Sequence, residues 1–214
     1  MDFSEFNERI VKIEKMELPG EQFHLKMAPI ERLLELKKLA REKNSAKKAA
    51  VLVLFYPSLT NETHFVLILR KTYKGVHSAQ IGFPGGKWEE GDLNYKETAL
   101  REAEEEVGMP ANEVSVLKEL TEIYIPPSNF FVQPYLGVTT KYPDFVAQEE
   151  EVEAILEVPL QEFLVDGART TEILATSYAE RIQVPAFLLQ GHVVWGATAM
   201  MLNEVREMLK QLLS

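Results

Sequence analysis

The sequence of 214 residues contains no cysteine. This absence excludes disulfide bonds, thiolate nucleophiles, and zinc or iron–sulfur sites held by cysteine. Long apolar runs are also absent: none approaches the roughly 18 residues of a membrane span, and residues 1–17 lack the apolar stretch of a signal peptide. We therefore expect a soluble, cytoplasmic protein with no membrane partner, in which any metal site uses oxygen or histidine ligands.

Positive charge is scarce. Lysine and arginine together number 23, against 33 for aspartate and glutamate, so the formal net charge is −10. A charge of this sign repels phosphate backbones, and no basic patch offsets it, so we expect no nucleic-acid polymer as a partner. A small phosphorylated ligand is compatible with this charge if metal ions intervene.

Hydrophobic residues make up 46% of the chain, which is enough for the core of one domain. Their spacing predicts helices at 3–15, 30–43, 95–107, 160–166 and 197–213. Continuous apolar runs predict strands at 49–56, 65–69, 81–83, 114–120, 123–125, 130–138 and 154–158. We predict an α/β fold whose mixed sheet is covered on both faces, formed by residues 46–214 and preceded by an N-terminal helical extension over residues 1–45.

An acidic helix over residues 95–107 has the clearest boundaries. Asn94 followed by Glu97 fits a capping box, and Gly108 fits a left-handed helix end. At about 100° per residue, one arc at the edge of the apolar stripe collects three glutamates. These are Glu102, Glu105 and Glu106.

Three carboxylates this close repel one another, by roughly 3 kcal/mol per pair at an effective dielectric constant of about 20. Arg101 can offset part of this repulsion and a divalent cation the rest, and oxygen ligands favour Mg²⁺ or Mn²⁺. A solvated acidic helix face is the alternative interpretation. The pair Gly85-Gly86 lies just upstream and lets a ligand approach the backbone closely, which favours a site for phosphate and metal.

From residue 101 the chain reads Arg-Glu-Ala-Glu-Glu-Glu-Val-Gly-Met. This run is similar to the second half of the Nudix box, Arg-Glu-aliphatic-any-Glu-Glu-any-Gly-aliphatic. In the first half, Gly86 fits the pattern, Asp92 replaces a glutamate, and eight residues rather than seven separate Asp92 from Arg101. The chain therefore resembles the Nudix hydrolase family, with residues 46–214 as the corresponding domain.

A second stretch resembles the coenzyme A diphosphatase branch of that family. The branch has an arginine after a strand, and then a His-any-Gly-Gln-like segment that runs into Phe-Pro-Gly-Gly. Here Arg70 follows an apolar run, and residues 77–86 read His-Ser-Ala-Gln-Ile-Gly-Phe-Pro-Gly-Gly. Gly75 and Ala79 depart from the Arg and Gly that are usual there.

The resemblance implies an α/β/α sandwich, a homodimer, and metal-dependent hydrolysis of a nucleoside diphosphate linked to a second group. The expected substrate is coenzyme A or a derivative, cleaved to 3′,5′-ADP and (acyl-)4′-phosphopantetheine. ADP-ribose or dinucleoside polyphosphates are alternative substrates. A catalytically idle module that senses a ligand is an alternative of another class.

The acidic helix and the resemblance together suggest residue roles. The expected metal ligands are Glu102 and Glu106, joined by Glu105 and the carbonyl group of Gly86. The expected catalytic residues are Arg101, which orients the carboxylates, and Glu105 or Glu151 as general base. Substrate contacts are expected from Arg70, His77, Gly85 and Gly86.

Overall fold

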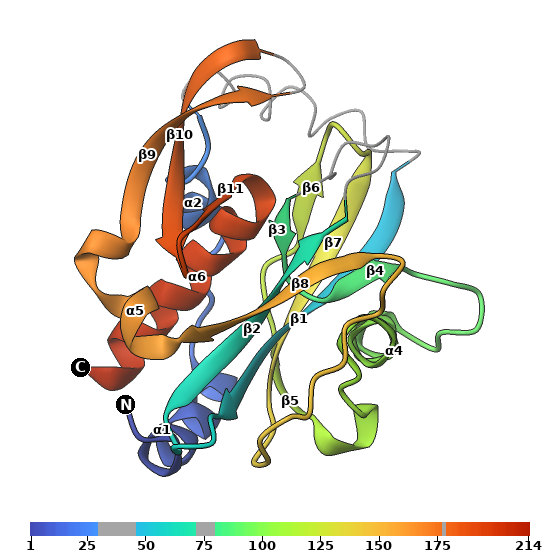
Figure 1. Ribbon diagram of the computed structural model, residues 1–214, viewed down its shortest axis with the longest axis vertical. Coiled ribbons are helices and arrows are strands. Elements are labelled where there is room, and N and C mark those ends of the chain that lie inside the picture. The colour runs from blue at the N-terminus through green and yellow to red at the C-terminus, as the bar shows by residue number, and fades with distance from the viewer. Residues whose placement is uncertain (30–45, 72–79, 177–178) are drawn as a thin grey trace.

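A computed structural model describes residues 1–29, 46–71, 80–176 and 179–214 of the chain (Figure 1). The helix predicted at 30–43 and the candidate substrate contact His77 lie outside these residues. No helix in the described ranges is long and apolar enough to cross a membrane.

The N-terminal segment forms α1 (Phe3–Ile10), the 3-10 helix η1 (Val11–Lys15) and α2 (Glu21–Leu25). The helix predicted at 3–15 is thus confirmed over its first half and continues as a 3-10 helix. The apolar side chains of Phe6, Ile10 and Ile13 are buried. Phe6 packs against Phe55 of the sheet, with ring centroids 5.2 Å apart, so this segment shares the core of the sheet.

A large mixed sheet forms the centre of the molecule. Its path runs β3-β2-β1-β7-β5, while β4, β6 and β8 pair with β1, β7 and β2. The central pair β1 and β7 is parallel, and the other pairs are antiparallel. The strands are β1 (Lys47–Pro57), β2 (Thr63–Arg70), β3 (Ile81–Gly82), β4 (Gly85–Lys87), β5 (Ser115–Glu119), β6 (Ile123–Ile125), β7 (Phe130–Val138) and β8 (Val152–Pro159). The predicted strands are confirmed with ends that differ by at most two residues, and β4 was not predicted.

A second, three-stranded sheet was also not predicted. It consists of β9 (Arg169–Thr176), β10 (Ala179–Leu189) and β11 (His192–Trp195), in the order β11-β10-β9. In β10, the buried Ile182 and Val184 alternate with the exposed Arg181 and Gln183. A search for continuous apolar runs misses this alternating part of the strand, and the apolar run that follows it, residues 184–189, contains Pro185, which disfavours assignment as a strand.

The helices cover both faces of the large sheet (Figure 1). Successive residues of β1 point to opposite faces: Leu52 and Leu54 share a buried cluster with α4 (Tyr95–Val107), whereas Val53 and Phe55 share another with α1 and α6 (Gly196–Leu213). The short α5 (Leu160–Leu164) also contributes to the second cluster. The predicted layered α/β architecture is therefore confirmed.

One buried glutamate of α6, Glu204, connects the N-terminal segment to the rest of the fold. Its carboxylate accepts hydrogen bonds from the backbone N–H of Gly20 at 3.1 Å, from the N–H of Thr121 at 3.2 Å, and from the Thr121 hydroxyl. The ring nitrogen Nε2 of the buried His24 lies 3.2 Å from its Oε2. Three segments far apart in the sequence thus meet at one carboxylate.

Candidate active site

The helix α4 that carries the predicted glutamates has well-defined ends. The Asn94 side chain accepts a hydrogen bond from the N–H of Glu97 at 3.1 Å, and the Glu97 carboxylate accepts one from the N–H of Leu93. Gly108 ends the helix with φ +73°, a value that favours glycine. The buried Ala99 and Val107 fix which side of α4 meets the sheet.

The three glutamates differ strongly in burial. The Glu106 and Glu102 side chains are 3% and 14% exposed, whereas that of Glu105 is 58% exposed. The predicted arc therefore runs from the core into solvent. Glu105 does not lie beside the core as Glu106 does, and Glu104 is exposed as well.

Glu106 is buried with one oxygen incompletely partnered. Its Oε2 accepts a hydrogen bond from the N–H of Gly85 at 2.7 Å. Its Oε1 is buried without a hydrogen-bond partner among the described residues, although Nη2 of Arg70 lies 3.1 Å away. Burial raises the pKa of Glu106 to about 7, against the opposing effects of Arg70 and the Gly85 N–H. Glu106 thus keeps one buried oxygen that accepts no hydrogen bond among the described residues and has only the charge of Arg70 beside it.

Glu102 lies directly against the backbone of β4. A Cβ atom added at Gly86 would be 2.3 Å from a carboxylate oxygen of Glu102, so a residue with a side chain does not fit there without displacing Glu102. Burial raises the pKa of Glu102, while Arg101, whose Nη1 is 3.0 Å away, opposes this rise. The Gly-Gly pair therefore serves a close approach of backbone and carboxylate.

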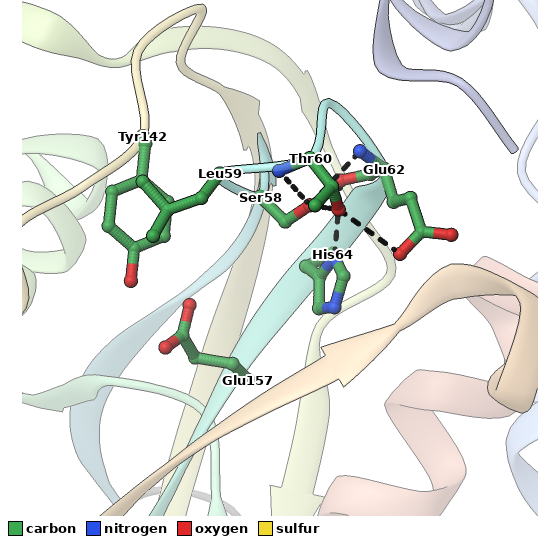
Figure 2. Close-up of a pocket in the computed structure, with 7 residues that line it drawn as sticks. All are labelled: Ser58, Leu59, Thr60, Glu62, His64, Tyr142 and Glu157. Carbon is green, nitrogen blue, oxygen red and sulfur yellow. Dashed lines mark hydrogen bonds between the residues drawn. The ribbon is translucent and has the colours of Figure 1, made fainter.

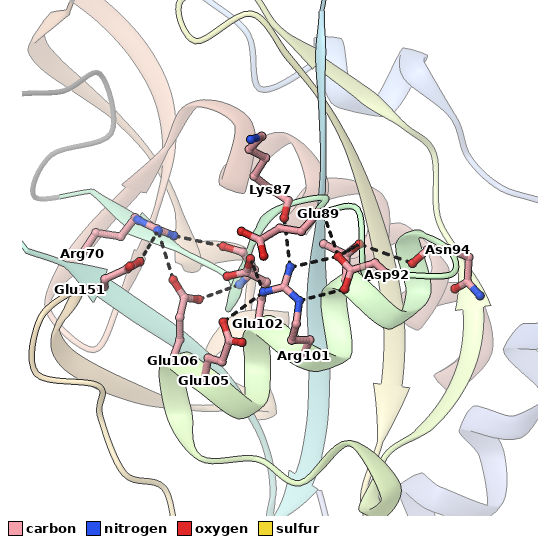
Figure 3. A network of polar contacts seen from close by, with 12 residues as sticks. Arg70, Lys87, Glu89, Asp92, Asn94, Arg101, Glu102, Glu105, Glu106 and Glu151 are labelled. Carbon is pink, nitrogen blue, oxygen red and sulfur yellow. Dashed lines mark hydrogen bonds and ion pairs between the residues drawn. The ribbon is translucent and has the colours of Figure 1, made fainter.

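Arg101 links the exposed and buried parts of this network (Figure 3). Its Nε and Nη2 donate to the two oxygens of Asp92 at 2.9 and 3.0 Å, and its Nη1 donates to Glu105 at 3.0 Å. It also donates to the carbonyl oxygen of Lys87. The hydrogen bonds from Arg101 to Asp92, with further ones from the Glu89 N–H and the Thr98 hydroxyl, lower the pKa of Asp92 to about 2.

The pairing of Asp92 with Arg101 was not predicted from the sequence. The signal that could have found it is the position of Asp92 in the first half of the Nudix-like pattern, where it replaces a glutamate. In the structure a loop and the first turns of α4 bring Asp92 beside Arg101. The shorter side chain and the altered spacing therefore still give a two-pronged ion pair.

Arg70, at the end of β2, faces the buried end of the same network (Figure 3). Its Nη2 lies 3.1 Å from Glu106 and 3.6 Å from Glu151, and its Nη1 donates to the carbonyl oxygen of Gly85 at 3.3 Å. Glu151 lies just before β8, and its side chain is 58% exposed. The fold thus brings together the predicted site residues that lie in the described ranges: Arg70, Gly85, Gly86, Arg101, Glu102, Glu105, Glu106 and Glu151.

These residues fit a hard divalent cation in their chemistry. All the donors are oxygens, the Oε1 of Glu106 lacks a hydrogen bond, and the bare backbone at Gly86 leaves space that Glu102 uses. Within the described residues, however, no three histidine, aspartate or glutamate side chains form a group that could hold one ion. The guanidinium groups of Arg70 and Arg101 pair with these carboxylates instead.

A hollow separate from these residues lies at the opposite end of β2, beside the β1–β2 turn (Figure 2). It has a volume of about 260 Å³ and is lined by Ser58, Leu59, Thr60, Glu62, His64, Tyr142 and Glu157. One of its two carboxylates, Glu157, already accepts a hydrogen bond from the buried Tyr56 hydroxyl at 3.0 Å. None of the predicted site residues lines this hollow.

A family model described as the NUDIX domain matches residues 46–177. The chain belongs to the Nudix family. The uncharacterised Nudix hydrolase NudL of Yersinia pestis (strain Pestoides F) is 31% identical over 163 residues, which cover 75% of this chain and 79% of the relative. NudL of Yersinia pseudotuberculosis (serotype O:1b, strain IP 31758) gives the same values.

Solved structures agree on the Nudix fold. The Nudix hydrolase RenU of M. smegmatis superposes with a TM-score of 0.54 at 16% identity, covering 78% of this chain and 87% of RenU. A MutT/nudix family protein from Enterococcus faecalis gives 0.52 at 14% identity, covering 85% of this chain and 69% of that protein. As a Nudix hydrolase, the chain hydrolyses a phosphorus-containing anhydride, the diphosphate of a nucleoside diphosphate derivative.

Proposed function

We propose that the substrate is coenzyme A or an acyl derivative, which the enzyme hydrolyses to 3′,5′-ADP and (acyl-)4′-phosphopantetheine. One placement supports this proposal above others: Arg70 lies 3.1 Å from Glu106 and donates to the Gly85 carbonyl oxygen. Both ends of the stretch that resembles the coenzyme A diphosphatase branch therefore lie at the acidic helix. A substrate phosphate that reaches Arg70 is also beside the candidate metal ligands.

The residues that would hold Mg²⁺ or Mn²⁺ are Glu102 and Glu106, with Glu105 and the Gly86 carbonyl group as further candidates. The incompletely partnered Oε1 of Glu106 supports this assignment. A divalent ion bound there would neutralise diphosphate oxygens and lower the pKa of a water molecule.

The remaining residues would orient groups and transfer the proton. Arg101, held by both oxygens of Asp92, keeps Glu105 at 3.0 Å from its Nη1. Glu105 and Glu151 are each 58% exposed, so water reaches both, and either one can accept the proton of the attacking water. Arg70 would donate hydrogen bonds to a substrate phosphate.

Gly85 contributes through its backbone. Its N–H donates to Glu106, and its carbonyl oxygen accepts from Arg70. It therefore positions an anion and a cation of the site, and its direct contact with substrate stays a prediction. A cytoplasmic location and a homodimer also stay predictions, the latter to be checked by sedimentation of the purified protein.

Hydrolysis of a substrate panel tests the proposal. The purified protein is incubated with Mg²⁺ or Mn²⁺ and one of four substrates: coenzyme A, acetyl-coenzyme A, ADP-ribose or a dinucleoside polyphosphate. Mass spectrometry then identifies the products by their masses. We expect 3′,5′-ADP and phosphopantetheine from coenzyme A, and neither from the Glu106→Gln control. Turnover of ADP-ribose or the dinucleotide alone would replace coenzyme A as substrate, and no turnover of any diphosphate would favour the ligand-sensing alternative.

A further inference from the structure

The two arginines of the site hold their carboxylates in different ways. Arg101 binds Asp92 through two hydrogen bonds of 2.9 and 3.0 Å, which is the two-pronged geometry of a strong ion pair. Arg70 makes three longer contacts, at 3.1 Å to Glu106, 3.3 Å to the Gly85 carbonyl oxygen and 3.6 Å to Glu151. The contact to the carbonyl oxygen is the one with hydrogen-bond geometry, and Oε1 of Glu106 has no hydrogen bond within the described part of the chain.

Arg70 thus places a positive charge beside Glu106 without donating a hydrogen bond to its Oε1. A buried carboxylate with no nearby cation is strongly destabilising, and Glu106 is 2% exposed. The guanidinium of Arg70 offsets this cost in the arrangement that the structure has. Its contacts with Glu106 and Glu151 place one positive group between two carboxylates from different parts of the chain.

A divalent cation that binds Glu106 needs the same oxygen. Two cations on one carboxylate oxygen repel each other, and the hydrogen-bond-free Oε1 is the atom nearest to Arg70 in their ion pair. The Arg70 side chain is 23% exposed and sits at the end of β2, so it can turn toward solvent. Displacement from Glu106 would leave the N–H donors of Nη2 available for a phosphate.

We propose that Arg70 is an internal counter-ion of Glu106 and Glu151 that competes with the divalent cation for these carboxylates. The inference rests on the metal site of the proposed function. In the metal-free enzyme Arg70 offsets part of the negative charge of these two carboxylates, and metal binding releases it toward the substrate's phosphates. Arg70 is a positioning residue in this first role and a substrate contact in the second.

The test is Mn²⁺ binding in the absence of any nucleotide, measured by isothermal titration calorimetry at pH 8. We expect Arg70→Gln to bind Mn²⁺ about three- to tenfold more tightly than the wild type, because the competing cation is gone. Lys71→Gln is the matched control: it removes one positive charge from the next residue, whose side chain is not part of the described network. Its affinity for Mn²⁺ should stay within about twofold of the wild type.

A second measurement, of melting temperature, keeps the test decisive if Arg70→Gln is less stable than the wild type. Metal-free Arg70→Gln should melt at a lower temperature than the wild type, and saturating Mn²⁺ should raise its melting temperature by more than it raises that of the wild type. Arg70→Gln that binds Mn²⁺ no more tightly than the wild type and gains no extra stability from it would overturn the counter-ion role alone. A wild type that binds no Mn²⁺ would overturn the metal site as well, and neither outcome depends on which nucleotide is the substrate.

Discussion

Glu106 and Glu204 are equally buried, on opposite faces of the large sheet, and their surroundings are opposite in kind. Glu204 is 0% exposed and receives hydrogen bonds from Gly20, from Thr121 and from the His24 ring. Burial acts to raise its pKa, yet these hydrogen bonds hold the pKa below its usual value. Glu106 is 2% exposed with one unbonded oxygen, and its pKa is raised.

The difference separates a structural carboxylate from the proposed metal ligand. At Glu204, hydrogen-bond donors of the protein itself offset the free-energy cost of burying the charge, so no ligand is needed. At Glu106 the N–H of Gly85 and the nearby Arg70 offset only part of this cost. Incomplete hydrogen bonding of a buried carboxylate, rather than burial alone, therefore supports the role proposed for Glu106.

The largest expected effect concerns catalysis. Glu106→Gln should lower kcat/KM by about 10³-fold with Mg²⁺, because a neutral amide is a poor ligand for a hard cation. Glu204→Gln, at a site of equal burial, should change kcat/KM by less than about threefold in the folded protein. Initial rates of diphosphate hydrolysis measure both, and equal losses in the two variants would remove the distinction.

The next effect concerns the free energy of unfolding, which the substitutions of Glu204 and Glu106 should change differently. Glu204→Gln should lower the free energy of unfolding by about 2–3 kcal/mol, because the new amide group meets N–H donors that lose their acceptor. In the metal-free protein, Glu106→Gln should leave this free energy unchanged or raise it by about 1 kcal/mol, because a costly buried charge disappears. Urea unfolding at pH 8 in the presence of a chelator compares the two. A loss of similar size in both would contradict the comparison.

A smaller effect is the pH dependence of the contribution of Glu204. Its pKa in the folded state is below the ordinary value of 4.5, so its ionised form is favoured by folding. The contribution is fully present above about pH 4.5 and is lost as the pH falls through the folded-state pKa. The stability difference between the wild type and Glu204→Gln, measured by urea unfolding between pH 7 and pH 3, should shrink on acidification. A stability difference that grows on acidification would mean that folding raises the pKa of Glu204 instead of lowering it.

The smallest effect tests whether the site depends on the precise end of α4. Asn94→Ala removes the side chain that accepts from the N–H of Glu97, and should cost about 1 kcal/mol of stability. The carboxylate network is held by Arg101 and Gly85 rather than by the cap, so kcat/KM should change by less than about twofold. Thermal unfolding and initial rates measure the two quantities on the same sample.

Local sequence signals were sufficient to predict the helix and the strands on which most of the site residues lie. The cap at Asn94, the stop at Gly108 and the apolar stripe of α4 predict both ends of the helix and the side that meets the sheet. Continuous apolar runs predict β1 and β2, and hence the position of Arg70 at a strand end. The Nudix-like spacing then assigns the family.

What the sequence could not supply are contacts that depend on tertiary packing. A helical wheel places Glu105 beside Glu106, yet their exposures differ widely, because β4 covers only part of the arc. The approach of Arg70 to Glu106 depends on how β2, β3 and the Gly-Gly segment meet α4. The hydrogen bonds of Glu204 join residues up to 184 positions apart, which no local pattern encodes.

The contacts of Glu204 also bear on the order of folding during synthesis. His24 and Gly20 leave the ribosome long before α6, and His24 precedes its partner Glu204 by 180 positions. In the same way Arg9 of α1 donates to the carbonyl oxygen of Leu213, 204 residues later, and Figure 1 shows the two chain ends on the same side of the molecule. The hydrogen bonds that join the N-terminal segment to α6 can therefore form only after α6 has been synthesised, whereas the contact of Phe6 with Phe55 of β1 is available much earlier.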